Sequence, residues 1–208
     1  MNNMKRISIF AAVMACLLLV QQIIYATPLY EQMLSYFAHH SLRFELYRAF
    51  WMVVRIALVG CFGWALYNNR RRLPMLQKGH TWFTLILAVA FTVPVIWSIA
   101  SPNYADYVTF CYSNSYLIIA LWALLAVWFI LLARTNYEEF ASEPAGMVGL
   151  MGAFTSLLIL ILGAHSFWTF FRHHFSAGWH SEALISWLLP SFFALVLWIY
   201  GLANLRKS

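Results

Sequence analysis

The basic residues of this 208-residue chain follow its apolar runs in a strict alternation. Six apolar runs can be traced, and nine lysines and arginines fall before the first run and after the second, fourth and sixth. They are Lys5, Arg6, Arg70, Arg71, Arg72, Lys78, Arg134, Arg206 and Lys207. Only three basic residues lie in the other gaps, and Arg55 lies inside the second run. Positive loops remain in the cytoplasm, so the sequence predicts an all-α polytopic membrane helix bundle with six transmembrane helices, both termini cytoplasmic and short loops.

The composition agrees with a membrane domain. Hydrophobic residues make up 63% of the chain and charged residues 10%, whereas soluble domains carry about 25% charged residues. Because about 20 apolar residues cross a hydrocarbon core, the sequence predicts a single transmembrane domain over 1–208. Its spans are expected at about 7–26, 49–68, 81–100, 115–134, 147–171 and 184–204. Short loops and the charge asymmetry favour a bacterial inner membrane.

Two features outside the main pattern need an interpretation. The first run can be a retained helix or a signal peptide cut near Ala26, and its length of about 20 residues favours a retained helix. The segment 27–48 carries apolar residues at helical spacing, which predicts a short amphipathic helix on the membrane surface. The net charge of +6 is explained by cytoplasmic loops that meet anionic headgroups, so nucleic acid is not expected as a partner.

Arg55 is the strongest candidate for a binding residue. An arginine inside a membrane span is costly and usually faces the bundle, pairs with another group or marks a ligand path. His165 in the fifth span is expected at a similar depth, with Ser166 and Thr169 about one turn away. These residues together predict a site for a bound lipid headgroup, a quinone carbonyl or an anionic substrate. The alternative is that Arg55 extends to the headgroups beside neighbouring rings.

Histidines gather on the side predicted to face outward. A weaker hypothesis places a metal there, because imidazoles with nearby carboxylates bind zinc, copper or iron. The candidate ligands are His39, His40, His173, His174 and His180. Metal is nevertheless not expected, since histidines at helix ends are ordinary interfacial residues. Haem is not expected either, because His165 has no partner at its depth.

The fifth span has one face of small residues, which lets a neighbouring helix approach closely. Gly149, Gly152, Ala153 and Ser156 form this face, and it predicts contact with other membrane subunits or a second copy. The three cysteines include no C-x-x-C pair, which speaks against a thiol-redox enzyme. The function favoured by the sequence is a non-enzymatic subunit, or an accessory or regulatory component, of a membrane complex. Two alternatives remain: a transporter-like protein for a small or lipidic substrate with Arg55 in the path, and an outward-facing metal- or quinone-linked redox protein that uses the histidine cluster.

Overall fold

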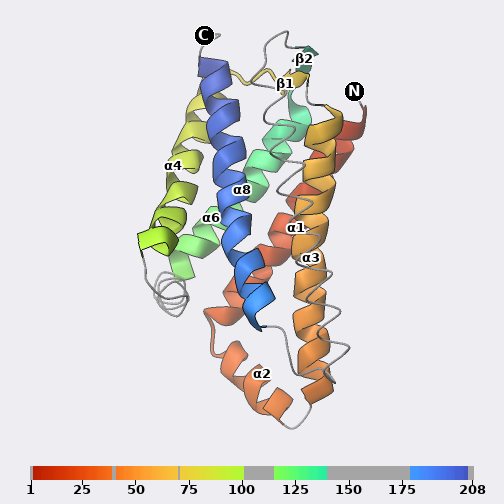
Figure 1. The fold of residues 1–208 in the computed structure, drawn as a ribbon, viewed down its shortest axis with the longest axis vertical. Coiled ribbons are helices and arrows are strands. Elements are labelled where there is room, and N and C mark those ends of the chain that lie inside the picture. Colours follow the sequence, from red (N-terminus) through yellow and green to blue (C-terminus); the bar gives the residue numbers. More distant parts are fainter. Residues whose placement is uncertain (1, 39–40, 70, 101–114, 140–178, 206–208) are drawn as a thin grey trace.

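Long helices that run side by side, roughly along the long axis of the molecule, make up most of the structure (Figure 1). The computed structural model describes residues 2–38, 41–69, 71–100, 115–139 and 179–205. The helices are α1 (Asn2–Tyr25), α2 (Leu29–Ala38), α3 (Ser41–Asn68), α4 (Lys78–Ala100), α6 (Ser115–Arg134) and α8 (Trp179–Leu205). The strands are β1 (Arg72–Pro74) and β2 (Tyr137–Glu139). The predicted membrane helix bundle is thus confirmed in its general form.

Four of the described helices are long and apolar enough to cross a membrane. Their apolar segments are Asn3–Tyr25, Leu46–Asn68, Lys78–Trp97 and Ser115–Arg134. They correspond to the first four predicted spans. The sixth predicted span lies within α8, whose apolar part covers Leu189–Leu205. The fifth predicted span, 147–171, falls outside the described residues.

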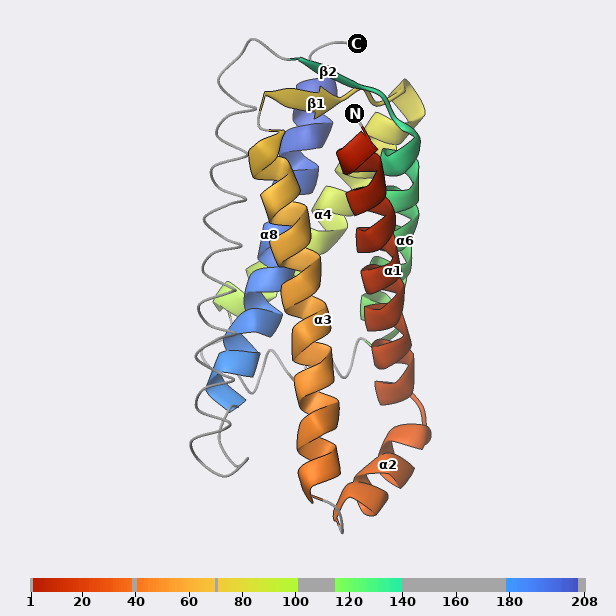
Figure 2. The same ribbon diagram turned by 90° about the vertical axis from the view of Figure 1, so that its right-hand side faces the viewer.

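The segment between the first two spans differs from the prediction in its boundaries. The expected short helix is present as α2, but α3 already begins at Ser41 rather than near residue 49. The sequence did not predict this extension because residues 41–48 include several polar side chains and form no apolar run. Such residues can nevertheless form helix. In Figure 2, α2 lies at the end of the bundle away from the two strands.

A two-stranded sheet, which the all-α prediction did not include, closes the opposite end. The strands are antiparallel, with Arg72 opposite Glu139 and Pro74 opposite Tyr137. Pro74 stops a helix after the second span, and strands of three residues are too short to give a periodic pattern. The sheet lies at the same end as the first turn of α1 and the last turn of α8 (Figures 1 and 2).

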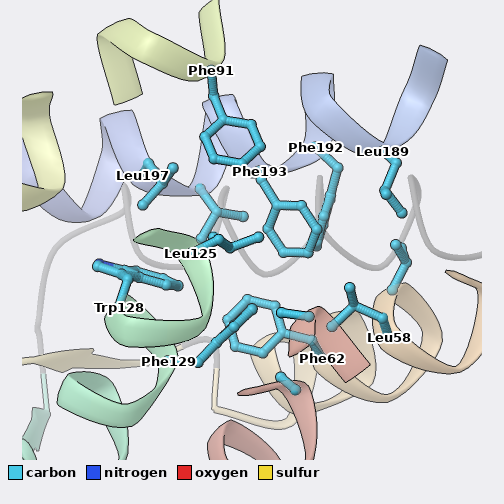
Figure 3. Packing of buried hydrophobic residues seen from close by; sticks show 14 of the residues in the cluster. Leu58, Phe62, Phe91, Leu125, Trp128, Phe129, Leu189, Phe192, Phe193 and Leu197 are labelled. Atoms are coloured by element: carbon cyan, nitrogen blue, oxygen red, sulfur yellow. The ribbon is translucent and has the colours of Figure 1, made fainter. Parts of the chain in front are cut away.

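Aromatic rings fill the middle of the bundle (Figure 3). Phe193 of α8 is fully buried and its ring centroid lies 6.3 Å from that of Phe62 in α3 and 5.8 Å from that of Phe129 in α6. Phe91 of α4 and Trp122 of α6 also lie at 6.3 Å from Phe193. Most of these pairs are edge-on, the arrangement that ring quadrupoles favour. One ring therefore contacts three other helices.

Two hydrogen bonds between side chains tie α4 to its neighbours. The indole of Trp128 in α6 donates to Thr84 Oγ1 at 3.0 Å. The indole of Trp198 in α8 donates to Thr92 Oγ1 at 2.9 Å. Polar side chains within membrane helices stabilise helix pairs in this way, each by about 0.6 kcal/mol on average.

Candidate functional site

Arg55 faces the interior of the bundle. Its side chain in α3 is only 8% exposed, and Nη2 donates a hydrogen bond to Gln21 Oε1 of α1 at 3.2 Å. Gln21 is fully buried, and its Nε2 donates to the Tyr25 hydroxyl at 2.8 Å. The guanidinium is therefore held between two helices, and the alternative in which it extends to the headgroups does not describe this structure.

Two more side chains of α3 lie on the same face as Arg55. Tyr47, Trp51 and Arg55 follow each other at intervals of four residues, so they stack along one side of the helix. The rings of Tyr47 and Trp51 are 6.0 Å apart and edge-on. We name Gln21, Tyr25, Tyr47, Trp51 and Arg55 the Arg55 cluster.

Two polar atoms of this cluster are buried without a hydrogen-bond partner among the described residues. They are the Trp51 indole Nε1 and the Tyr47 hydroxyl. The Tyr47 hydroxyl lies beside the polar groups of Trp51 and Tyr25 but meets hydrogen-bond geometry with neither. A buried donor left in this state costs about 1–3 kcal/mol, so the protein carries a local cost at this position.

Aromatic residues of α2 cover the cluster on the side away from the sheet. The Phe37 ring lies 5.7 Å from the Tyr47 ring and 5.5 Å from the Phe44 ring. Tyr30 of α2 packs edge-on against Tyr25 at 4.8 Å. The short helix therefore packs against the ends of both α1 and α3, and it shields the polar groups between them.

The chemistry of the cluster is dominated by hydrogen-bond donors. An indole N–H only donates, a guanidinium carries five N–H donors, and a phenol can donate as well. The two atoms of this cluster that are buried without a partner among the described residues, Trp51 Nε1 and the Tyr47 hydroxyl, can both donate to an acceptor oxygen, as in a carbonyl, a carboxylate or a phosphate. The arrangement can therefore bind and orient an oxygen-bearing group between α1 and α3.

The other residues predicted for the site cannot be compared with this cluster. His165, Ser166 and Thr169 lie outside the described residues, as do His39, His40, His173 and His174 and the small-residue face formed by Gly149, Gly152, Ala153 and Ser156. His180 lies in the first turn of α8. Within the ranges that the structure describes, no three histidine, cysteine or acidic side chains gather to hold a metal.

Sequence reasoning found Arg55 but did not identify Gln21 as its hydrogen-bond partner. Gln21 and Gln22 interrupt an otherwise apolar run, and an amide inside a membrane span is itself a signal that a polar partner is near. The four-residue recurrence of Tyr47, Trp51 and Arg55 was also visible. The sequence does not show which helix faces Tyr47, Trp51 and Arg55, because that depends on how α1 and α3 pack.

Comparison with known proteins adds no family. No family model, no curated protein and no solved structure matches the chain. The class follows from the fold alone: several apolar helices of membrane-spanning length, packed around an aromatic centre, define a membrane-embedded helical protein.

Proposed function

We propose that the protein spans a bacterial inner membrane six times, with both termini in the cytoplasm. Support comes from the end of the bundle that carries the sheet. Exposed Arg71, Arg72 and Lys78 lie in or next to β1 and at the start of α4. The first turn of α1 and the last turn of α8 lie at the same end (Figure 2). Basic residues and both ends on one side are the arrangement that the positive-inside rule predicts.

We further propose that the protein is a non-enzymatic subunit, or an accessory or regulatory component, of a membrane complex. The observation that carries this proposal is the filled centre of the bundle. Phe62, Phe91, Phe129 and Phe193 come from four helices and are each at most 2% exposed, so packed rings occupy the space between these helices. A path for a solute needs polar or open lining at this depth, and these rings offer neither.

Purification in a gentle detergent, after crosslinking in cells, tests this proposal. We expect a membrane protein to be recovered with the chain in fixed stoichiometry. A chain that is strictly monomeric in native mass spectrometry, with no crosslinked partner, would contradict the proposal. Uptake into proteoliposomes that is lost in Arg55→Ala would instead establish the transporter alternative.

The Arg55 cluster supports a second role, the binding of an oxygen-bearing group from a lipid or a quinone. The specific observation is that Trp51 Nε1 and the Tyr47 hydroxyl are buried and unpartnered among the described residues beside a buried arginine. A ligand oxygen that accepts from these donors removes the cost of leaving them unsatisfied. A hydrogen bond to a charged oxygen, such as that of a lipid phosphate, is worth about 1.5–3 kcal/mol, so for such a ligand each donor should change the affinity by about tenfold or more.

Trp51→Phe, with Trp82→Phe as the control, tests the binding role. Trp82 is an exposed indole on α4 and should not affect the cluster. Lipids and quinones that co-purify with each variant are extracted and measured by mass spectrometry. We expect one species to fall about tenfold in Trp51→Phe and to be unchanged in Trp82→Phe. Equal amounts in the two variants would exclude the cluster as a binding site.

A further inference from the structure

An apolar groove runs along the outside of the bundle between α1 and α6. Its volume is about 550 Å³. Ile9, Val13 and Val20 line it from α1 and Ile130 from α6, and all four side chains are exposed. This surface shares no residue with the Arg55 cluster.

Small side chains form the floor of this groove. Ala12 and Cys16 lie on the α1 side and Ala133 on the α6 side. Because α1 and α6 pack against each other, these small side chains leave a hollow that the larger lining residues border.

The length of the α1 wall of the groove agrees with one leaflet, whereas α6 lines the groove only from Ile130 to Arg134. The α1 wall extends from Ile9 to Val20, and eleven residues of helix rise by about 16 Å. Half of a hydrocarbon core about 30 Å thick is about 15 Å. The groove begins where α6 ends at Arg134, which is the sheet end of the bundle. The α1 wall therefore matches the depth of a single acyl chain in the leaflet at that end.

Among the residues that line the groove, the positive charge lies at the sheet end, on Arg134. Arg134 is exposed and lines the groove, and it forms no ion pair within the described ranges. Arg6 is exposed and lies three residues before Ile9, so it extends the same face of α1 by about one turn. No acidic residue lines the groove.

We propose that this groove binds one anionic phospholipid from the leaflet at the sheet end. An acyl chain lies along Ile9 to Val20, and the lipid phosphate contacts Arg134 with Arg6 beside it. The match of length, apolar lining and charge at one end favours a lipid over a helix of another protein. This inference does not depend on the role of the Arg55 cluster.

Native mass spectrometry of the full-length protein, delipidated in detergent, tests the site. The probes are dioleoyl phosphatidylglycerol and dioleoyl phosphatidylcholine. We expect the first phosphatidylglycerol to bind more tightly than phosphatidylcholine. Arg134→Gln should weaken phosphatidylglycerol binding about fivefold, because one basic residue near a membrane surface contributes about 1 kcal/mol. Lys78→Gln removes an exposed charge at the same end away from the groove, and should leave this binding unchanged.

Variants that fill the groove distinguish lipid binding in the groove from a general attraction of lipid to the protein surface. Cys16→Trp places a large ring in the hollow and should abolish the first bound lipid of either headgroup. Ala133→Phe fills the same space from the α6 wall and should give the same loss, which covers the case that one variant fails to fold. The proposal is overturned if Arg134→Gln and Lys78→Gln weaken binding equally. It is also overturned if both filled variants still bind the lipid, or if they release a co-purified protein instead.

Discussion

Replacing Tyr47 by phenylalanine should change stability and ligand binding in opposite directions. The substitution removes one hydroxyl and keeps the ring that packs against Trp51 and Phe37. In the structure this hydroxyl is buried and has no hydrogen-bond partner among the described residues. Its removal therefore leaves no cavity of note and takes away an unsatisfied polar group.

The size of the effect follows from the cost of an unpartnered donor. Burying such a group costs about 1–3 kcal/mol, so the free energy of unfolding of delipidated Tyr47→Phe should rise by about 1 kcal/mol, the lower end of that range. A ligand oxygen that accepts from the hydroxyl loses one hydrogen bond in the variant. If the oxygen is charged, the loss is about 1.5 kcal/mol or more, which weakens binding about tenfold.

The assay is unfolding of the purified protein in mixed micelles, followed by circular dichroism, with and without the co-purified lipid fraction. Tyr116→Phe is the matched control, because Tyr116 is 82% exposed at the start of α6 and its change should stay within about 0.5 kcal/mol. A delipidated Tyr47→Phe protein that is less stable than the wild type refutes the reasoning. It would show that the hydroxyl has a partner that stabilises the fold in the absence of ligand.

Three further predictions concern the fold. Phe193→Ala should lower the free energy of unfolding by at least about 2 kcal/mol, since each lost ring pair costs about 0.5 kcal/mol or more. Exposed Phe50→Ala, which loses the single ring pair with Trp51, should lower it by only about 0.5–1.5 kcal/mol; equal effects would contradict the central role of Phe193. Gly201→Ala should cost about 1–3 kcal/mol, because its Cβ would lie 2.5 Å from Leu85 Cδ2; an unchanged midpoint in detergent unfolding would show that this contact gives way freely. Burial raises the pKa of the Tyr137 phenol in β2. The stability that the protonated phenol contributes is therefore fully present below pH about 10 and is lost as the pH rises above that value. Tyr137→Phe should reduce the decrease in the free energy of unfolding that is measured between pH 9 and 11.

Much of the helix pattern was predictable because membrane spans are set by local composition. The predicted bounds of the first, third and fourth spans agree with those of α1, α4 and α6 to within a few residues. An apolar run of about 20 residues in lipid must form a helix, because only a helix satisfies all of its backbone hydrogen bonds within the segment. The start of α3 at Ser41 and the pairing of β1 with β2 were not predictable. Both depend on neighbours: α2 packs against α3 through Phe37, and Asn136 accepts a backbone hydrogen bond from Met75.

The candidate site divides in the same way. The cost of charge in hydrocarbon singled out Arg55 from sequence alone. The four-residue spacing of Tyr47, Trp51 and Arg55 is a further signal in the sequence that these side chains share one helix face. That Gln21 of α1 accepts the hydrogen bond from Arg55, and that Trp51 and Tyr47 remain unsatisfied among the described residues, required the packing of α1, α2 and α3. The groove between α1 and α6 likewise has no sequence signature, because its walls are more than 100 residues apart in the chain.

Local composition is sufficient to specify that this chain forms membrane helices, and it identifies Arg55 as the charge that hydrocarbon must accommodate. Composition acts locally, residue by residue, and lipid allows few backbone structures. Which helix faces contact each other depends on the tertiary packing. In the packed bundle Arg55 faces inward and contacts Gln21, and four phenylalanines lie at the centre. A groove with small lining residues remains between α1 and α6. These outcomes depend on the relative placement of helices, which side-chain shapes determine together and no single segment encodes.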